Sequence, residues 1–220
     1  MKKVKEWFLQ HLWAISVCYF IFYFIAFFTL EQVLEPRYIL HSPIDDLIPF
    51  CEWFIIPYAA WFFLIAGSLG YFLFRSRKDY LRLCFLMYVG MTLCLLIYVI
   101  APNGLNLRVE LTRDNLASRV VGMLQSVDTP TNVCPSIHVV VTLVIDMVVL
   151  RSETLKGKWL AKGAITVLAV LICASTVFLK QHSVIDVAGA MLLCAAVYPL
   201  VYAPGASRAG EKDQESVLIR

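Results

Sequence analysis

The chain has 220 residues, of which 60% are hydrophobic and only 16% are charged, and its net charge is +3. Charged residues make up about a quarter of an ordinary soluble domain, so this composition excludes that class. No basic patch typical of nucleic-acid binding is present. The apolar residues occur in long runs, and about 20 apolar residues span a bilayer core as a helix. We therefore expect an all-α, polytopic membrane protein.

Six apolar runs predict six transmembrane helices. The first follows the basic segment Met1–Lys5 and resembles a secretory signal. It is too long for the apolar part of a signal and no small-residue cleavage site follows it, so we expect an uncleaved span. The fourth run is short and contains Asp146, for which we expect a hydrogen bond to a neighbouring span. The predicted spans are Leu12–Leu34, Trp53–Phe74, Leu81–Ala101, Ser136–Leu150, Trp159–Leu179 and Val184–Ala203.

The distribution of cations predicts the orientation. With six spans, fourteen of the nineteen lysines and arginines fall in the terminal segments and in the two loops on the same side as the termini. Positive residues collect in cytoplasmic segments, so both termini are expected in the cytoplasm. The expected organisation is a cytoplasmic N-terminus at 1–11, one membrane domain at 12–203 and a polar, disordered cytoplasmic tail at 204–220.

The seven cysteines are odd in number and lack metal-ligand spacing, so we expect mostly buried free thiols. A disulfide between Cys51 and Cys134 was considered and is not favoured. In the first outer loop, Asp45, Asp46 and Glu52 either face the site or face water, and we expect a solvated interfacial loop.

The longest segment outside the predicted spans is 102–135, and such a long loop is often functional. A turn is predicted at 101–104. The apolar spacing from Leu116 to Leu124 predicts a short amphipathic helix capped near Asp114 and lying along the membrane interface. The segment then continues from Asp128 to Cys134 directly into the fourth span.

Residues that can take part in acid–base and nucleophilic chemistry are concentrated between the last two spans, in the segment 175–186. If a helix begins at or just before His182, Asp186 lies on the same face, four residues later. Its carboxylate can then bind one imidazole nitrogen and leave the other free to attack or to accept a proton. Ser175 and Lys180 lie in the same segment, and Lys180 either contacts phosphate or reaches to lipid headgroups.

A second group of candidate residues begins the fourth span. Pro135 suits the first turn of a helix, and the free N–H groups behind it form, with the Ser136 hydroxyl, a site suited to phosphate. His138 lies in the same turn, and the predicted topology puts it on the same outer face as His182. Two histidines, a carboxylate, a serine and cations at one face suggest phosphoryl transfer, with one imidazole as nucleophile and the other as general acid. The mechanism requires no metal or other cofactor.

These residues resemble the membrane branch of the type 2 phosphatidic acid phosphatase superfamily. Its third motif matches at Ser175, His182 and Asp186 with the spacing intact, its second motif matches at Pro135, Ser136 and His138, and its first motif survives only as Arg108. The resemblance implies a six-span fold with an active site at the extracytoplasmic face. It also implies these roles: His182 as nucleophile, Asp186 as its orienting partner, His138 as general acid, and Ser136 and Arg108 as phosphate ligands.

The chain departs from the family pattern at four positions. Ala101 stands in place of the first-motif Lys, Val109 in place of Pro, Ile137 in place of Gly and Thr176 in place of Arg. Two phosphate-binding cations are therefore missing. Either other cations replace them, with Arg113, Arg119 and Lys180 as candidates, or the substrate carries less charge. The second alternative resembles the inositolphosphorylceramide synthase and sphingomyelin synthase branches.

Three functional hypotheses follow. The first is a lipid phosphate phosphatase acting through a phosphohistidine, and the second is a lipid phosphotransferase that uses a phosphodiester donor. The third and least favoured is a non-catalytic lipid-binding protein. The expected partners are membrane lipids and a lipid phosphate or phosphodiester substrate. Asp128, Asn132 and the Gln181–His182 pair are similar to bacterial members, which implies a bacterial plasma membrane.

Overall fold

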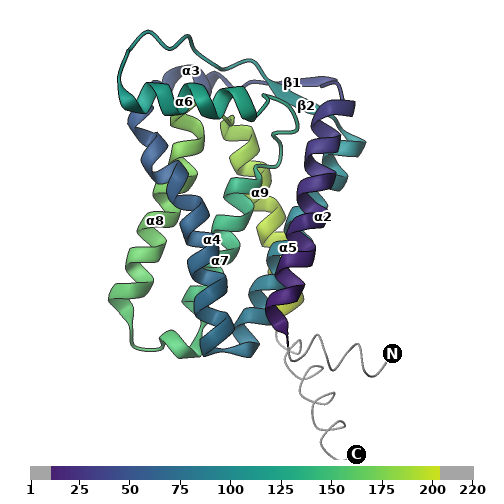
Figure 1. Ribbon diagram of the computed structural model, residues 1–220, viewed down its shortest axis with the longest axis vertical. Helices are drawn as coiled ribbons and strands as arrows, with labels where there is room; N and C mark the ends of the chain where they lie inside the picture. The colour runs from purple at the N-terminus through teal and green to yellow at the C-terminus, as the bar shows by residue number, and fades with distance from the viewer. Residues whose placement is uncertain (1–10, 204–220) are drawn as a thin grey trace, which may run out of the picture.

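Long helices run alongside one another and are covered at one end by short elements (Figure 1). The computed structural model describes residues 11–203, so the predictions for 1–10 and for the tail at 204–220 lie outside the described residues. We call the covered end the loop end and the opposite end, where the described chain begins and finishes, the terminal end. The long helices are α2 (Leu12–Val33), α4 (Ile55–Arg75), α5 (Arg77–Ile100), α7 (Ile137–Arg151), α8 (Trp159–Phe178) and α9 (Val184–Val197).

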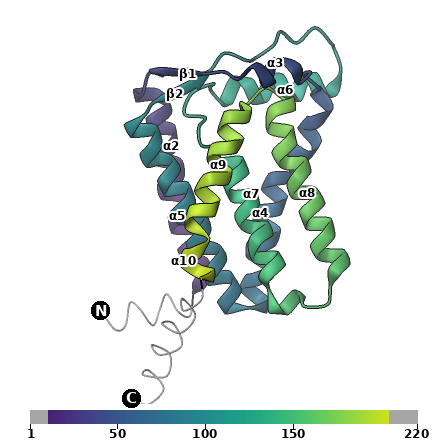
Figure 2. The ribbon, with the colours of Figure 1, turned by 180° about the vertical axis from the view of Figure 1, so that it is seen from behind.

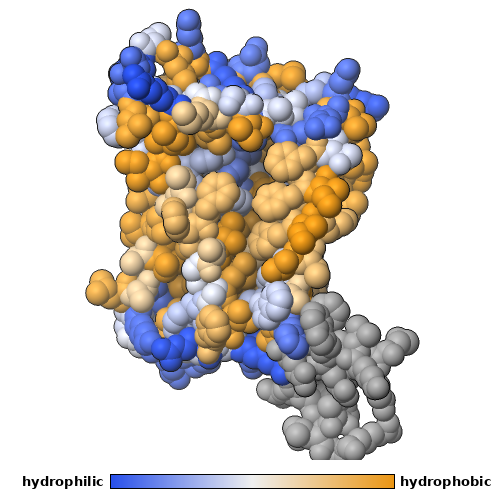
Figure 3. Space-filling model, in the orientation of Figure 1, coloured by the Kyte–Doolittle hydropathy of each residue, from blue (hydrophilic) through white to orange (hydrophobic). Residues whose placement is uncertain are grey.

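Five helical segments in the described residues are long and apolar enough to cross a membrane: Leu12–Val33, Glu52–Arg75, Arg77–Ile100, Trp159–Phe178 and Val184–Tyr202. They lie close to five of the six predicted spans. The prediction of a mostly helical protein with several candidate membrane spans is therefore confirmed. The last segment combines α9 with the short α10 (Pro199–Tyr202). Large hydrophobic side chains cover the middle of the face seen in Figure 3, and polar residues collect at both ends.

The fourth predicted span is the exception. It forms α7, but this helix has 15 residues, about 22 Å of rise against a bilayer core of about 30 Å. It packs against α4, α5, α8 and α9, and nine of its residues are buried. The largely apolar sequence of α7 therefore reflects its burial among four neighbouring helices of the bundle. Thr166 donates a 2.8 Å hydrogen bond to Asp146, which confirms the expected contact between neighbouring helices.

A glycine permits the close contact between α5 and α7. A Cβ at Gly90 would lie 2.8 Å from Cγ1 of Val140, whose side chain is completely buried. Glycine is therefore required here for the two helices to approach this closely. This contact helps to fix α7, which carries His138 at its loop end.

The loop end contains two short strands, so the fold is not strictly all-α. Strand β1 (Tyr38–Leu40) pairs in parallel with β2 (Asn103–Leu105), which ties the segment after α2 to the segment after α5. The same end holds α3 (Pro43–Leu47) and the single turn η1 (Glu52–Phe54), while η2 (Glu153–Leu155) joins α7 to α8 at the terminal end. Figure 2 shows α9 and α8 from behind, both reaching up to this layer.

The predicted amphipathic helix is confirmed as α6 (Leu116–Val127), which lies across the loop end (Figure 1). Its N-cap is Asn115, one residue after the predicted cap, and the Asn115 side chain accepts a 2.8 Å hydrogen bond from the backbone N–H of Ser118. The buried side of α6 packs on η1 and α4. All seven cysteines are free, three of them buried, and Cys51 and Cys134 form no disulfide.

Candidate active site

His182 lies in the tight connection between α8 and α9. The carbonyl of Thr176 accepts hydrogen bonds from the backbone N–H groups of both Gln181 and His182, each at 3.0 Å. Lys180 adopts a left-handed backbone conformation with φ of 57°, and this reverses the chain. Such a conformation is strained for a residue with a Cβ, so surrounding contacts must hold it in place.

His182 and Asp186 interact as the sequence predicts, but through a different local structure. Nδ1 of His182 lies 3.1 Å from Oδ2 of Asp186. Helix α9 begins at Val184, as the predicted last span does, so the condition of a helix from His182 onward is not met. Ser183 is the N-cap, and its backbone N–H donates to the same Asp186 oxygen at 2.9 Å in a capping box. Asp186 therefore caps the helix and orients the imidazole at the same time.

Asp45 belongs to this site, although we expected it to be solvated. It is 2% exposed, and its carboxylate accepts hydrogen bonds from the Ser183 hydroxyl at 2.6 Å and from the Val184 N–H at 2.9 Å. The Ser42 N–H donates a third bond at 2.8 Å. The loop after α2 thus supports the start of α9. A Ser-x-x-Asp capping box at Ser42 was the available sequence signal, but it predicts only α3.

His138 lies in the first turn of α7 and faces His182. The centroids of the two imidazole rings are 5.8 Å apart. The His138 ring also contacts Tyr58 at 4.6 Å and Trp61 at 4.4 Å between centroids, so two aromatic residues of α4 fix its position. The structure therefore brings together His138, His182 and Asp186.

The two predicted serine ligands are both buried and both form hydrogen bonds with the backbone. Ser136 is completely buried and is the N-cap of α7, where its hydroxyl accepts the Val139 N–H at 3.4 Å. The helix starts after it, so Pro135 precedes the first turn. Ser175 is also completely buried, and its hydroxyl donates to the Ile172 carbonyl at 2.6 Å. Neither hydroxyl is available to a phosphate in this arrangement.

Lys180 also differs from its predicted role. Its ammonium donates to the carbonyl oxygens of Asp45 and Ile48, each at 2.5 Å, and the residue is buried. The left-handed backbone directs this side chain toward the loop after α2, away from His182. Lys180 therefore fastens that loop to the α8–α9 connection instead of contacting phosphate.

Arg108 is anchored behind the histidines. Its guanidinium donates to the carbonyls of Gln125, at 3.0 Å, and Asp128, and to the Gln181 side-chain oxygen at 3.2 Å. Its buried Nε has no hydrogen-bond partner among the described residues. Arg108 thus contacts Gln181, the neighbour of His182, while most of its donors hold the segment that ends α6.

The other two candidate replacement cations point elsewhere. Arg113 is 70% exposed and binds Glu52 at 2.9 Å, and Asn115 donates to the same carboxylate at 3.0 Å. Glu52 is therefore buried and paired, not solvated as we expected. Arg119 is exposed and pairs with Asp114. These contacts remove all three candidates from the space in front of His182.

A cavity of about 190 Å³ lies in front of the two histidines. It is bounded by α2, α4, α6 and the segment that leads into α7, and the hollow below α6 is visible in Figure 3. Aromatic side chains form most of its apolar wall. The polar side chains that line it are Glu31, Asp128, Thr129, Thr131, Asn132, His138, Gln181 and His182.

Several residues of this wall were not predicted as site residues. Asp128 and Asn132 were noted only as a segment similar to bacterial proteins. Burial raises the pKa of the Asp128 carboxyl above its ordinary value, while the nearby His182 and Arg108 partly oppose this shift. Asn103 holds the same segment, because its side-chain oxygen accepts the N–H groups of Val133 at 3.0 Å and Cys134 at 2.8 Å. The sequence signal at Asn103 indicated only a turn.

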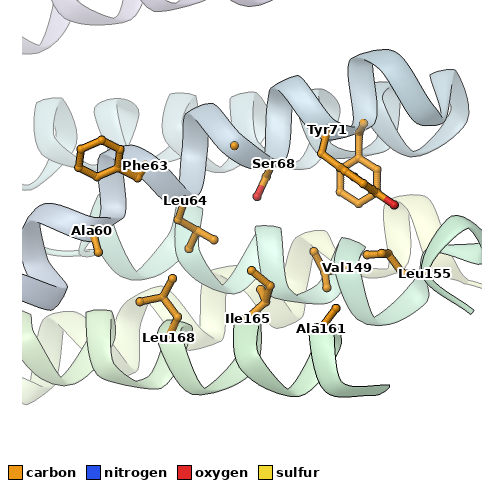
Figure 4. Close-up of a pocket in the computed structure, with 12 residues that line it drawn as sticks. Ala60, Phe63, Leu64, Ser68, Tyr71, Val149, Leu155, Ala161, Ile165 and Leu168 are labelled. Carbon is orange, nitrogen blue, oxygen red and sulfur yellow. The ribbon is translucent and has the colours of Figure 1, made fainter. Parts of the chain in front are cut away.

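A second cavity, of about 400 Å³, lies between α4 and α8 on the side of the terminal end (Figure 4). The residues that line it are apolar except for Ser68 and Tyr71. It contains neither a histidine nor a carboxylate among its described lining residues, so it offers no acid–base pair. Within residues 11–203, no group of three or more histidine, cysteine or acidic residues is arranged to hold a metal ion.

Comparison with known proteins adds no assignment. No family model, curated protein or solved structure matches this chain. Function must therefore be inferred from the geometry and from the motif resemblance.

The geometry indicates what the site can do chemically. Because Nδ1 of His182 is bound to Asp186, the opposite ring nitrogen, Nε2, is the one available to a ligand in the cavity. His138 lines the same cavity and can supply a proton to a group that leaves from a ligand there. Two imidazoles beside an apolar wall suit a ligand with a hydrophobic part.

Proposed function

We propose that this protein is a membrane enzyme that cleaves a phosphoric ester of a lipid through a phosphohistidine intermediate. The observation that carries the proposal is the 3.1 Å contact between His182 and Asp186, next to a cavity that His138 also lines. An oriented imidazole with one free nitrogen is an activated nucleophile. The motif resemblance to type 2 phosphatidic acid phosphatases supports the same chemistry.

The reaction begins with attack of His182 Nε2 on phosphorus. The bond from phosphorus to the leaving oxygen breaks, and His138 donates a proton to that oxygen. Asp186 stabilises the imidazolium character that His182 acquires. In the second step water, or the hydroxyl of an acceptor, attacks the phosphohistidine after losing its proton to His138, and this regenerates both residues.

The orientation of the enzyme is part of the proposal. Arg75, Arg77, Lys78 and Arg82 lie around the α4–α5 turn, and Arg151, Lys156, Lys158 and Lys162 lie around the α7–α8 turn, so eight described cations gather toward the terminal end. Five lie in the segments of the loop end. Under the positive-inside rule the terminal end faces the cytoplasm and the histidines face outward. A six-span topology follows if α7 crosses with its neighbours.

Two reactions fit this site. The first is hydrolysis of a lipid phosphate, which rests on the broad membership of the phosphatase superfamily. The second is transfer from a phosphodiester donor, which a specific observation favours. Among the described residues that line the cavity there is no lysine or arginine, and Arg113, Arg119 and Lys180 are engaged elsewhere. A dianionic monoester needs more neutralisation than a monoanionic diester, since each charge-assisted contact contributes about 1.5–3 kcal/mol.

The experiment is a panel of lipid phosphates and phosphodiesters incubated with purified protein in detergent. Phosphate release identifies the hydrolase, and a new phosphodiester lipid without free phosphate identifies the transferase. His182→Ala should abolish either product, and Asp186→Asn should reduce turnover by orders of magnitude while the protein still folds. If His182→Ala retains full activity, the proposal is wrong. If no tested lipid reacts with the unsubstituted protein, the non-catalytic lipid-binding hypothesis gains support.

A further inference from the structure

The charge of the cavity is unusual for a site that would bind only phosphate. Its described lining residues include two carboxylates, Glu31 and Asp128, two histidines and no lysine or arginine. A phosphate group brings further negative charge into this space. A ligand that carries a positive group together with its phosphate would be better matched to the wall.

The two carboxylates lie in the same part of the wall. Glu31, near the end of α2, accepts hydrogen bonds from the Thr129 hydroxyl at 2.6 Å and from its N–H at 3.3 Å. Thr129 follows Asp128 directly in the chain, so this contact joins the two acids. Two like charges beside an apolar cavity destabilise each other. Arg108 interacts with both carboxylates but does not line the cavity, so a cation bound on the cavity side would stabilise them further.

The apolar part of the wall suits an ammonium group. Eight aromatic side chains line the cavity: Tyr23, Phe24, Phe27, Phe28, Tyr58, Trp61, Phe62 and Tyr98. Aromatic faces attract alkylammonium cations, and clusters of aromatic residues recur in sites for quaternary ammonium groups. Phe24, Phe28 and Phe62 are also exposed on the outside of α2 and α4, where acyl chains would lie.

One buried polar group in the wall completes no hydrogen bond among the described residues. It is the side-chain N–H₂ of Asn132, a residue that is 4% exposed. Leaving such a group unpaired is costly, so a ligand that binds it gains that free energy. It can donate to a phosphodiester oxygen and adds no charge, whereas the hydroxyl of Tyr58 already interacts with the Asp128 carboxylate.

We propose that the cavity binds a zwitterionic phospholipid, with its ammonium group between Glu31, Asp128 and the aromatic wall and its phosphodiester near Asn132 and the histidines. This inference rests on the proposed function for the identity of the reacting group and extends it to the class of substrate. Phosphatidylcholine and phosphatidylethanolamine carry the required chemistry. Phosphatidylglycerol lacks the cation, and phosphatidic acid lacks it and carries more negative charge.

The test measures binding separately from turnover. The inactive protein His182→Ala is titrated by calorimetry with short-chain phosphatidylcholine, phosphatidylethanolamine, phosphatidylglycerol and phosphatidic acid of equal acyl length. We expect at least one of the two ammonium lipids to bind at least tenfold more tightly than phosphatidylglycerol and phosphatidic acid. Adding Glu31→Gln or Asp128→Asn should remove most of this preference. Adding Asp46→Asn, which changes an exposed carboxylate at the same end, should leave it intact.

Equal binding of phosphatidylglycerol, or a preference that survives both Glu31→Gln and Asp128→Asn, would overturn the inference. Thermal unfolding of each variant verifies that it is folded before the comparison is made. Turnover by the unsubstituted protein distinguishes the two proposals. Turnover without a preference for ammonium lipids would support the proposed function and reject the cation site. A preference for ammonium lipids without turnover would support the cation site and reject the proposed function.

Discussion

The carboxylate of Asp45 lies 2.6 Å from the hydroxyl of Ser183, although 138 residues separate them in the chain. Through Ser183 this contact reaches Asp186, and through Asp186 it reaches His182. The orientation of the proposed nucleophile therefore depends on the loop after α2 as well as on its own segment.

Asp45→Asn should lower kcat by about 10- to 100-fold and change KM little. The amide can replace only part of the carboxylate's acceptor capacity, so α9 and Asp186 lose a fixed position, while the lipid-binding wall is unchanged. Steady-state kinetics below the unfolding temperature of both proteins measures the effect. Asp46→Asn is the matched control because Asp46 is exposed. An unchanged kcat in Asp45→Asn would show that the contact has no positioning role.

Arg108→Ala should lower kcat/KM by about 100-fold, more than Lys180→Ala does. Arg108 holds the carbonyls of Gln125 and Asp128 and contacts Gln181 at the cavity, whereas Lys180 fastens a loop behind the site. Removing a charged donor from buried acceptors costs about 1.5–3 kcal/mol per bond. For Lys180→Ala the main expected effect is a lower unfolding temperature. The opposite ranking of the two variants in kcat/KM would mean that Lys180, and not Arg108, supports the phosphate site.

Asp128→Asn should increase stability at neutral pH while it decreases activity. Burial raises the pKa of this carboxyl in the folded protein, so the folded state binds the proton more tightly than the unfolded state does. Stability then falls as pH rises from the unfolded pKa, near 4, through the higher folded pKa. The amide of the Asp128→Asn variant cannot ionise, so the variant does not lose stability in this way. The unfolding temperature of Asp128→Asn should therefore exceed that of the unsubstituted protein at pH 7 and equal it below about pH 4. A variant that is less stable at pH 7 would contradict this account of Asp128.

Gly90→Ala should destabilise the bundle by about 1–3 kcal/mol, because the added methyl group would meet Val140 at 2.8 Å between α5 and α7. Gly163→Ala in α8 is the control, since nothing lies within 4 Å of its Cβ position, and it should be neutral or slightly stabilising. Thermal unfolding in detergent compares the two. Equal stability of both variants would mean that α7 can move away from α5 without cost.

The sequence predicts the helices well, because an apolar run of sufficient length specifies a helix without any tertiary information. Five predicted spans correspond to helices long enough to cross a membrane, and α6 forms where its apolar spacing indicates. The sequence shows that α7 is short but not that it lies at the centre of the bundle, since an apolar helix looks the same whether lipid or protein surrounds it.

The residues of the candidate site were only partly predictable, because some of their contacts are local in the chain and others depend on the tertiary fold. The four-residue spacing of His182 and Asp186 is local, so it was visible in the sequence. The contact of Asp45 with Ser183 requires the tertiary fold. The direction of Lys180 depends on its positive φ, and the burial of Ser136 and Ser175 depends on neighbouring helices. Local spacing therefore indicates the reacting pair but not the groups that position it.

The most direct test of the central claim is to trap the covalent intermediate. The protein is mixed with a lipid carrying ³²P in its phosphoric ester, quenched in alkali within the first turnover and analysed for label on the protein. We predict label that is stable in alkali and lost in acid, as expected for phosphohistidine, and that is located on His182 and missing from His182→Ala. Label that persists on His182→Ala, or turnover of the lipid without any labelled protein, would contradict the assignment of His182 as the nucleophile.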